Sequence, residues 1–439
     1  MTMSVIILMA MREAIMLWWN QVDDFQVQII QKGFMNRIFN LSGFVFLTCF
    51  FLAGTVTAET ASKQSFTEWL DSFYLVAAKK GITRATYDRA FAGVTTPDKK
   101  VLKKAAYQPE FTTEIWDYLD ARVNNAAITN GRIMAGVYRK TLQEIEAEFG
   151  VESSVLLAIW SMESSYGAAL LRSSRLHYVP RALATLAYAD KRRRKFARSQ
   201  LLATLEIIQA GDVKVEQLTG SWAGAMGHTQ FIPTSFLAYG VDMDKDGRRD
   251  IWHSIPDALA TAANLLHTNK WRSGKPWGLE VIVPPNGAHF EGDTKTLAQW
   301  QKLGFVRPAG VAFKDLQETA ELKMIGGDNG PGFLMFHNFF VIKRYNNSDF
   351  YALAVGLLAD RLAGRKGMNQ TWPRPKGSLT VEEKMELQEL LKKRGFYSGE
   401  LDGRIGGNTR KGIREFLLQD GLQAKDLTSE DILEALRKE

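Results

Sequence analysis

The sequence predicts an α+β protein that is mainly α-helical, with a small β part and a separate helical domain at the C-terminal end. Three segments between residues 66 and 365 place apolar side chains at spacings of three and four, which is typical of amphipathic helices. Two short apolar runs predict strands, and a stretch rich in Gly, Pro and basic residues marks a boundary. Of the 439 residues, 46% are hydrophobic and 23% charged, so the chain can bury a large core and a second small domain.

The first 58 residues form an N-terminal extension that contains an expected export signal at residues 35–58. Arg37 provides its basic start, residues 44–52 are apolar, and "VTA" ending at Ala58 offers small side chains for cleavage. The apolar run is shorter than the roughly 20 residues of a membrane-spanning helix. We therefore expect export with cleavage after Ala58, a membrane anchor being the alternative, and Met35 as the candidate start.

The only cysteine, Cys49, lies inside this signal, so the mature chain is expected to contain neither disulfides nor a catalytic thiol. Thr48 is bulkier than the small residue that precedes a lipidated cysteine, so we expect no lipid anchor. The extension carries equal numbers of basic and acidic residues, and the net charge of +7 therefore belongs to the exported part. This basic excess fits a polyanionic partner but discriminates poorly between cell wall, nucleic acid and membrane.

Residues 64–365 form the expected main domain, residues 366–378 the linker and residues 379–439 the C-terminal domain. The predicted helices of the main domain are Val137–Gly150, Asp257–Trp271 and Asp349–Gly364. The predicted strands are Leu279–Pro285 and Phe339–Lys343.

Glu163 is the most informative single residue. At helical spacing it continues the line of Val155 and Ile159, so it extends an apolar face where a surface residue is not expected. A carboxylate so placed loses hydration, and its pKa should rise toward neutrality, as a general acid requires. Gly167 then suits a helix stop. The alternative is a solvated Glu near a helix end.

A second block, Gly220–Phe236, combines Gly and small residues with neutral polar and aromatic side chains. Gly and Ala allow a flat ligand to approach the backbone closely. Ser221, His228 and Gln230 offer neutral hydrogen-bonding groups, while Trp222 and Phe231 offer apolar faces. This mixture suits a carbohydrate, which is polar at its edges and apolar on its ring faces. A tightly packed turn is the alternative.

Four motifs in order, "ESSYG", "GSWAGAMGHTQFIPTSF", "DMDKDGRRDIWHSIPDALATAANLL" and "RYNNSDFYALAV", resemble the lytic murein transglycosylase B family, glycoside hydrolase family 103. The resemblance covers most of residues 64–365 and implies a lysozyme-like α-rich catalytic domain. It also implies cleavage of the β-1,4 bond between N-acetylmuramic acid and N-acetylglucosamine in peptidoglycan. No water is added, and the product has a 1,6-anhydromuramyl end.

By this resemblance Glu163 is the single catalytic acid and base, and the C6 hydroxyl of the muramyl residue is the nucleophile. One carboxylate is then sufficient, whereas glycoside hydrolases usually need two. The chemistry requires no cofactor. The family's substrate contacts fall on Ser221, Gln230, Tyr345 and Asn346, with Tyr166 expected near the acid.

The segment Asp242–Trp252 resembles the start of an EF-hand loop and predicts a candidate structural Ca²⁺ site. Its acidic residues at loop positions 1, 3, 5 and 9 are Asp242, Asp244, Asp246 and Asp250. His253, a poor Ca²⁺ ligand, stands at position 12, where a bidentate Glu belongs. Some members of the resembled transglycosylase family close a longer loop with a later Asp, and by that resemblance Asp257 is the candidate that closes the loop here. An Asp- and Gly-rich turn without metal is the alternative.

The C-terminal segment Leu387–Leu422 is similar to the peptidoglycan-binding domain 1 family, a small three-helix fold. Gly395-Phe396-Tyr397, Asp402-Gly403 and Phe416 carry the resemblance, whereas Gly412 and Leu417 replace a usual Ala and Gln. The alternative is a helical tail for protein contacts.

Together these observations predict a periplasmic enzyme of cell-wall turnover or remodelling that acts on peptidoglycan strands. We expect a monomer, with cell-wall synthesis or division machinery as candidate partners and no nucleic acid. The rival functions are a lysozyme-like hydrolase that uses Glu163 and a non-catalytic wall-binding protein. The basic run Lys191–Lys195 is either a solvated helical face or a contact with a polyanion.

Overall fold

The computed structural model describes residues 64–106, 114–403, 405–422 and 427–438. Phe66–Glu439 forms one compact unit. The expected export signal at residues 35–58, with Cys49 and the extension before it, lies outside the described residues.

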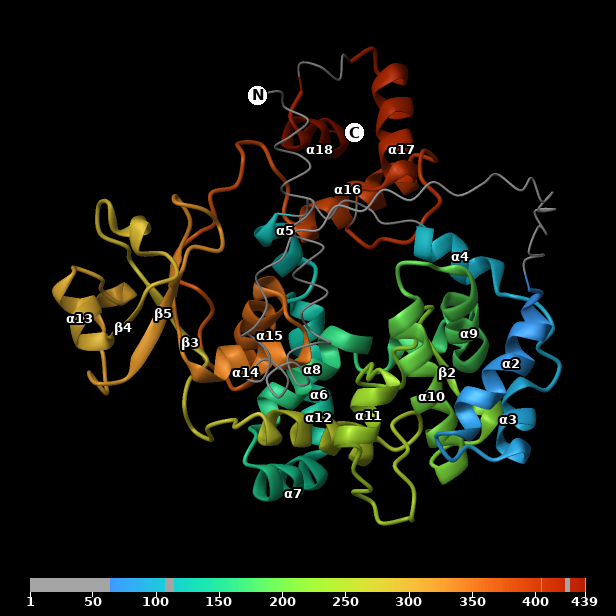
Figure 1. The fold of residues 1–439 in the computed structure, drawn as a ribbon. Helices are drawn as coiled ribbons and strands as arrows, with labels where there is room; N and C mark the ends of the chain where they lie inside the picture. The colour runs from blue at the N-terminus through green and yellow to red at the C-terminus, as the bar shows by residue number, and fades with distance from the viewer. Residues whose placement is uncertain (1–63, 107–113, 404, 423–426, 439) are drawn as a thin grey trace, which may run out of the picture. The chain divides into compact units, whose positions relative to one another are not determined.

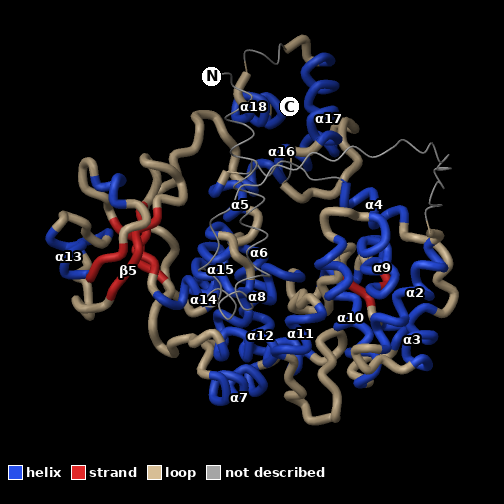
Figure 2. Tube along the Cα trace, viewed as in Figure 1, coloured by secondary structure: helices blue, strands red, loops and turns tan. Residues whose placement is uncertain are grey.

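Helices make up most of the described chain, as predicted for a mainly α-helical protein (Figure 1; Figure 2). The α-helices before the C-terminal domain are α2 (Phe66–Ala78), α3 (Arg84–Phe91), α4 (Lys99–Ala106), α5 (Ile115–Asp120), α6 (Asn125–Val137), α7 (Arg139–Phe149), α8 (Ser153–Ser164), α9 (Val179–Ala189), α10 (Arg194–Ala210), α11 (Pro233–Tyr239), α12 (Ile255–Thr268), α13 (Leu297–Lys302), α14 (His337–Tyr345) and α15 (Asp349–Leu362). The short 3-10 helices are η1 (Ala168–Leu171), η2 (Ser173–Arg175), η3 (Val215–Gln217), η4 (Gly287–Phe290) and η5 (Pro308–Gly310).

The central helix is α8, which packs against α15, α6, α12 and α7. Its buried residues lie on every side of the helix and include Val155, Leu156, Ile159 and Trp160, as expected for a helix enclosed by others. Among the described residues, Ser153–Leu171 is long and apolar enough to span a membrane by length and composition alone. However, 56% of its most apolar window is buried inside the fold, as a core helix would be.

The three helices predicted from apolar spacing are all present. Val137–Gly150 corresponds to α7, which begins at Arg139 and stops where Gly150 adopts φ 67°, a left-handed conformation that favours glycine. Asp257–Trp271 corresponds to α12, which starts two residues earlier because Ser254 caps it. Asp349–Gly364 corresponds to α15, capped by Ser348.

The β part consists of a two-stranded and a four-stranded antiparallel sheet. Strands β1 (His177–Tyr178) and β2 (Thr219–Gly220) form the first. In the second the strand order is β3-β6-β5-β4, where the strands are β3 (Gly278–Val281), β4 (Thr294–Thr296), β5 (Thr319–Lys323) and β6 (Gly332–Met335). The larger sheet has its own small core, which includes Val281, Trp300 and Leu334. Figure 2 shows its strands gathered beside α13.

One strand prediction is wrong. Leu279–Pro285 contains most of β3, but Phe339–Lys343 lies inside helix α14. A short apolar run with β-branched and aromatic residues does not distinguish a strand from a buried helix. Phe339 and Ile342 are both buried, three residues apart, so packing on the helical core decided the outcome.

The C-terminal domain has the predicted three helices, α16 (Val381–Lys393), α17 (Gly407–Gln419) and α18 (Ser429–Arg437), around a core of its own. Gln388 is fully buried and accepts a hydrogen bond from Gly403 N at 2.9 Å while donating to Asp402 Oδ1 at 2.9 Å. Gly412, which replaces the family's usual Ala, has a structural reason here: a Cβ would lie 2.5 Å from Phe396 O.

The expected linker, residues 366–378, is held along the main domain by several contacts. Glu280 on β3 accepts hydrogen bonds from the backbone nitrogens of Asn369 at 2.9 Å and Gln370 at 2.7 Å. Arg374 donates two bonds of 2.7 Å to Asp120 at the end of α5. These fixed contacts differ from the behaviour of a free flexible tether.

Candidate active site

Helix α8 presents Glu163 one residue before its end, and the chain then turns sharply. Ser165, Tyr166 and Gly167 have φ of 51°, 57° and 90°, three successive residues in the left-handed region. Two of them are not glycine, and such backbone strain concentrates at functional sites. The turn leaves Glu163 half-buried on the line of Val155 and Ile159, as the spacing predicted.

Burial raises the pKa of Glu163 to about 7, while the hydrogen bond from Tyr351 and the nearby Arg122 lower it. The phenol of Tyr351 donates to Glu163 Oε1 at 2.6 Å. Oε1 is thereby occupied, so Oε2 is the oxygen left to carry and release a proton. A carboxyl group with a pKa near 7 can act as acid and as base at neutral pH.

Two tyrosines form the wall behind this carboxyl group. Tyr345 and Tyr351 are stacked, with ring centroids 6.4 Å apart and planes at 12°. Burial, and then the neighbouring charge of Glu163, raise the pKa of both phenols well above the usual range. Both therefore remain neutral hydrogen-bond donors. Tyr345 uses its hydroxyl on Thr229 O at 2.5 Å, which joins α14 to the Gly-rich block.

The Gly-rich block folds into a compact double turn. Ser221 N donates to Ala225 O at 2.7 Å, and Met226 and Phe231 exchange backbone hydrogen bonds of 2.8 and 3.0 Å. The Ser221 hydroxyl accepts from Ala225 N at 3.0 Å. Gln230 has φ 52° and donates its amide to Gly227 O at 2.8 Å. The side chains of Ser221 and Gln230 thus help to shape the block that carries them.

His228 fastens this block to the end of α8. Ser164 Oγ donates to His228 O at 2.6 Å, and Trp160 Nε1 donates to His228 Nδ1 at 3.2 Å. Because the indole can only donate, Nδ1 must be unprotonated and the ring proton must lie on Nε2. Burial lowers the pKa of His228, in agreement with a neutral ring. Gly167 makes room for the imidazole, since a Cβ there would lie 2.5 Å from His228 Cε1.

The remaining two predicted contact residues occupy different positions. Tyr166 packs edge-on against Trp160 and donates its hydroxyl to Ala127 O on α6 at 2.9 Å, so its phenol stabilises the turn after Glu163. Asn346 ends α14 with an exposed side chain, directly after Tyr345.

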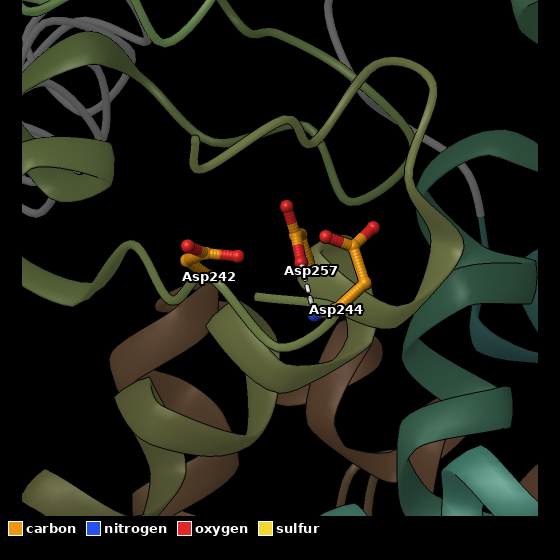
Figure 3. A group of neighbouring side chains, drawn as sticks. All are labelled: Asp242, Asp244 and Asp257. Atoms are coloured by element: carbon orange, nitrogen blue, oxygen red, sulfur yellow. Dashed lines mark hydrogen bonds between the residues drawn. The ribbon is translucent and has the colours of Figure 1, made fainter. Parts of the chain in front are cut away.

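The acidic loop brings three of its five predicted ligands together. Carboxylate oxygens of Asp242, Asp244 and Asp257 lie within 4.8 Å of one another (Figure 3). Asp257 is fully buried, and its two oxygens accept hydrogen bonds from the backbone nitrogens of Met243, Asp244 and Asp250. Burial raises the pKa of Asp257, and these backbone bonds oppose the shift.

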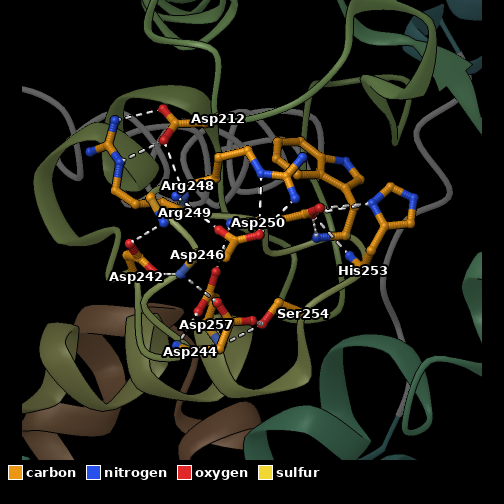
Figure 4. Close-up of polar contacts among 12 residues, drawn as sticks. Asp212, Asp242, Asp244, Asp246, Arg248, Arg249, Asp250, His253, Ser254 and Asp257 are labelled. Carbon is orange, nitrogen blue, oxygen red and sulfur yellow. Dashed lines mark hydrogen bonds and ion pairs between the residues drawn. The ribbon is translucent and has the colours of Figure 1, made fainter.

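The other two loop carboxylates have different partners (Figure 4). Asp246 forms an ion pair with Arg248 at 2.6 Å. Asp250 accepts from Trp252 N at 2.9 Å and contacts His253 Nδ1 at 3.0 Å. His253, at position 12, is therefore engaged with a carboxylate and offers no ligand to the group of three.

Tyr351 and Arg122 are the functional candidates that sequence reasoning missed. Tyr351 lies inside the quoted motif "RYNNSDFYALAV", six residues after Tyr345, but no spacing rule linked it to Glu163. Arg122 NH1 donates to Met162 O at 3.0 Å and follows α5, far from any motif. Only the packing of α15 against α8 and the hydrogen bond from Arg122 to α8 reveal these roles.

A cavity of about 330 Å³ lies elsewhere, between the loop Arg272–Pro276 and the start of α14. Its charged lining is partly neutralised by the pairs Arg272–Glu318 and Lys275–Asp315. Because none of the predicted site residues lines it, we treat it as separate from the site around Glu163.

The fold and this site define an α-rich, lysozyme-like protein whose candidate site centres on the half-buried Glu163. The chain matches the transglycosylase SLT domain family over residues 65–360 and belongs to that family. Residues 380–424 match the peptidoglycan binding domain family. The resemblance deduced from the ordered motifs is thereby confirmed.

Solved structures agree with this assignment. SltB3 of Pseudomonas aeruginosa, in complex with NAG-anhNAM-pentapeptide, is 42% identical, with a TM-score of 0.67 over 85% of this chain and 100% of that chain. The lytic transglycosylase Slt35 of Escherichia coli, in complex with calcium, shares the fold at 23% identity, with a TM-score of 0.57 over 70% of this chain and 94% of that chain.

A curated relative is the membrane-bound lytic murein transglycosylase B of Escherichia coli (strain K12), which is 28% identical over 240 residues. The match covers 54% of this chain and 64% of that protein.

Proposed function

We propose that the protein is a lytic transglycosylase that cleaves the bond between N-acetylmuramic acid and N-acetylglucosamine in peptidoglycan. The observation that carries this proposal is the environment of Glu163, a single acid whose pKa burial raises to about 7 and whose Oε1 is held by Tyr351. Among the described residues, no second acidic side chain contributes to the pKa of Glu163. A hydrolase would need such a second carboxylate.

The reaction begins with Glu163 protonated. Its Oε2 donates a proton to the glycosidic oxygen as the bond from that oxygen to the muramyl C1 breaks. The resulting carboxylate then takes the proton of the muramyl C6 hydroxyl while O6 bonds to C1. One C–O bond breaks and one forms, the proton returns to Glu163, and no water is consumed. The nucleophile belongs to the substrate, which favours ring closure over attack by a separate molecule.

Two neutral phenols line the carboxyl group and suit a sugar substrate, while Arg122 is the charged neighbour. Tyr345 and Tyr351 offer an aromatic wall that suits the apolar face of a sugar ring. We assign substrate contacts to Ser221, Gln230, Tyr345 and Asn346, since the first two lie on the double turn and the others end α14. Tyr166 supports the turn after Glu163 through its bond to Ala127 O.

Product analysis tests the proposal directly. Purified peptidoglycan digested with the protein should yield 1,6-anhydromuramyl ends, and Glu163→Gln should abolish their release while folding is retained. Reducing muramyl ends would instead assign a hydrolase. Wall binding with no cleavage by the wild-type protein would assign a non-catalytic role.

The C-terminal domain fits a module that retains the enzyme on the wall, in keeping with the peptidoglycan binding domain match at residues 380–424. A peptidoglycan-cleaving enzyme acts at the cell wall, so we place the mature protein in the periplasm. The expected signal at residues 35–58 would then supply its export, and neither a protein partner nor a cofactor is needed for the chemistry.

The acidic loop is a candidate structural Ca²⁺ site. Three carboxylates converge within 4.8 Å, and hard carboxylate oxygens are the ligands that Ca²⁺ prefers. Asp242, Asp244 and Asp257 would hold the ion, which would reduce repulsion among their charges and tie the loop to the start of α12.

Thermal unfolding checks this site. A chelator should lower the Tm of the wild-type protein, and added Ca²⁺ should restore it. Asp242→Asn should remove the response, whereas Asp246→Asn should preserve it because Asp246 is paired with Arg248. An unchanged Tm of the wild-type protein would make the loop a plain turn.

A further inference from the structure

The net charge of this protein is concentrated in two short segments. Residues 98–106 and 190–195 together contain nine Lys or Arg and two Asp, a formal charge of +7. The whole chain also has a net charge of +7, so all other residues together are neutral. A cluster of this kind produces a local positive field that attracts anions.

The fold brings these segments side by side. Helix α4 packs against α9, and Figure 1 shows the two as neighbours. Arg193, in the turn between α9 and α10, is buried and donates to Ala105 O at the end of α4 at 3.3 Å. It also pairs with Asp190 at 2.6 Å, so its own charge is neutralised and its role is to brace the turn.

Most of the other cations of the two segments face solvent, whereas Lys104 is partly buried. We call the following exposed side chains the basic face: Lys99, Lys100, Lys103, Lys191, Arg192 and Arg194. None of them forms an ion pair with an acidic side chain in the described part of the chain. Both Asp residues of the segments already have partners, since Asp190 binds Arg193 and Asp98 binds His177.

The basic face is joined to the Gly-rich block. The guanidinium of Arg193 lies 5.3 Å from the ring centroid of Trp222, the residue after Ser221. Strand β1 also pairs His177 with Gly220, directly before Ser221, and His177 Nε2 lies 3.3 Å from Lys104 Nζ on α4. Arg193 and Lys104 therefore link the two basic segments to the block that we assign to the glycan.

A membrane surface is a poorer match for this face. Basic segments that bind membranes usually combine cations with exposed apolar side chains that enter the bilayer. None of the exposed large apolar side chains of the described protein lies in residues 98–106 or 190–195. An anion carried by the glycan itself requires no such anchor.

From these observations we propose that the basic face binds the carboxylates of the stem peptides carried by the muramyl residues of the bound strand. This inference rests on the proposed function, because it takes the strand in the Gly-rich block to be peptidoglycan. In this proposal the basic face takes part in substrate selection. The protein prefers peptide-bearing strands over bare glycan.

The test compares two substrates. One is peptidoglycan with intact stem peptides, and the other is glycan from which an amidase has removed them. The variant Lys103→Gln/Lys191→Gln/Arg192→Gln should raise the half-saturating concentration of the peptide-bearing substrate about five- to tenfold at low ionic strength. On the bare glycan it should match the wild-type protein. At ~1 M salt the difference should vanish.

A matched control separates the face from general charge loss. Lys140→Gln/Lys302→Gln/Lys314→Gln removes three exposed cations from other surfaces and should leave both substrates unaffected. Equal losses on peptide-bearing and bare glycan, or no loss on either, would overturn the proposal. So would wild-type binding to phosphatidylglycerol vesicles that the basic-face variant loses while it retains its preference for peptide-bearing strands.

Binding measured with Glu163→Gln keeps the two proposals distinguishable. If the wild-type protein forms no anhydro ends on either substrate, the proposed function fails. Selective sedimentation of Glu163→Gln with peptide-bearing strands, reduced by the basic-face substitutions, would still support the role of the face.

Discussion

At the scale of single residues, the site depends on keeping one carboxyl group partly protonated. Glu163 sits at the end of a buried helix, and its pKa rises to about 7 because burial disfavours the charged form. The phenol of Tyr351 counteracts part of that rise. The proposed catalytic role of Glu163 and the stability of the fold are therefore in conflict at this position.

Glu163→Gln should stabilise the protein at alkaline pH. In the folded state Glu163 retains its proton up to about pH 7, whereas its unperturbed pKa is 4.5. The wild-type protein therefore loses stability as the pH rises between these values, by up to about 3 kcal/mol. Chemical denaturation at pH 8 should show a higher free energy of unfolding for the variant, and the difference should disappear near pH 4. Glu144→Gln on the exposed surface of α7 should show no such gain.

Tyr351→Phe should move the alkaline limit of activity upward. The variant removes a hydrogen bond that lowers the pKa of Glu163. Glu163 should therefore stay protonated up to a pH that is higher by roughly half to one unit. The lost orientation of Oε1 should reduce kcat about tenfold. Tyr345→Phe is the control, because its hydroxyl bonds to Thr229 O and should leave the limit in place. Identical pH profiles for Tyr351→Phe and the wild-type protein would contradict this role.

At the scale of elements, the turn after α8 and the double turn of the Gly-rich block interlock. Ser164 and Trp160 hold His228, and His228 occupies the space that Gly167 leaves open. The position of Glu163 therefore depends on a glycine four residues later. Gly167 is therefore needed for two reasons: its left-handed φ and the space that it leaves for His228.

Gly167→Ala should lower the free energy of unfolding by about 2–4 kcal/mol, because Ala disfavours φ 90° and its Cβ would collide with His228. Gly211→Ala is the matched control: φ is 82°, but a Cβ there meets nothing within 4 Å. Its loss should be only about 1 kcal/mol. Urea unfolding of both variants checks the difference, and equal losses would show that His228 packing adds nothing.

Sequence patterns predicted the elements whose signals are local. The spacing of Leu142, Ile145 and Phe149 and the stop at Gly150 suffice for α7. The same reasoning failed at Phe339–Lys343, since a five-residue apolar run fits both a strand and a helix. Whether it pairs with β6 or packs on the core is decided by distant residues.

The candidate site likewise combines a residue that a local sequence pattern predicts with contacts that no local pattern contains. Glu163 could be recognised because a charge interrupts an apolar line on its own helix. The bond from Tyr351 joins residues 188 positions apart, so no local pattern contains it. In the acidic loop, spacing suggested four ligands and the family resemblance a fifth, Asp257, but Arg248 and His253 pair with Asp246 and Asp250. Competition between side chains is a property of the folded loop.

At the scale of the whole molecule, α5 connects the C-terminal domain to the candidate active site around Glu163. On one side Asp120 accepts two bonds from Arg374 of the linker, and Asp117 binds Lys384 of α16. Just after the helix, Arg122 donates to Met162 O beside Glu163 and lowers its pKa. A helix of only six residues has little stability of its own, so these contacts hold it together with its buried Ile115, Trp116 and Leu119.

Arg374→Gln should loosen α5 without unfolding the C-terminal domain. The substitution removes the guanidinium that donates both 2.7 Å bonds, and the free energy of unfolding should fall by about 1–3 kcal/mol. Hydrogen exchange of residues 115–123 should accelerate, since α5 would lose its anchor while Lys384 alone remains. Arg437→Gln is the control, because Arg437 makes an equivalent pair of bonds to Glu386 within the C-terminal domain. Exchange in α5 that is equally fast in both variants, or unchanged in Arg374→Gln, would show that the linker does not support the helix beside Glu163.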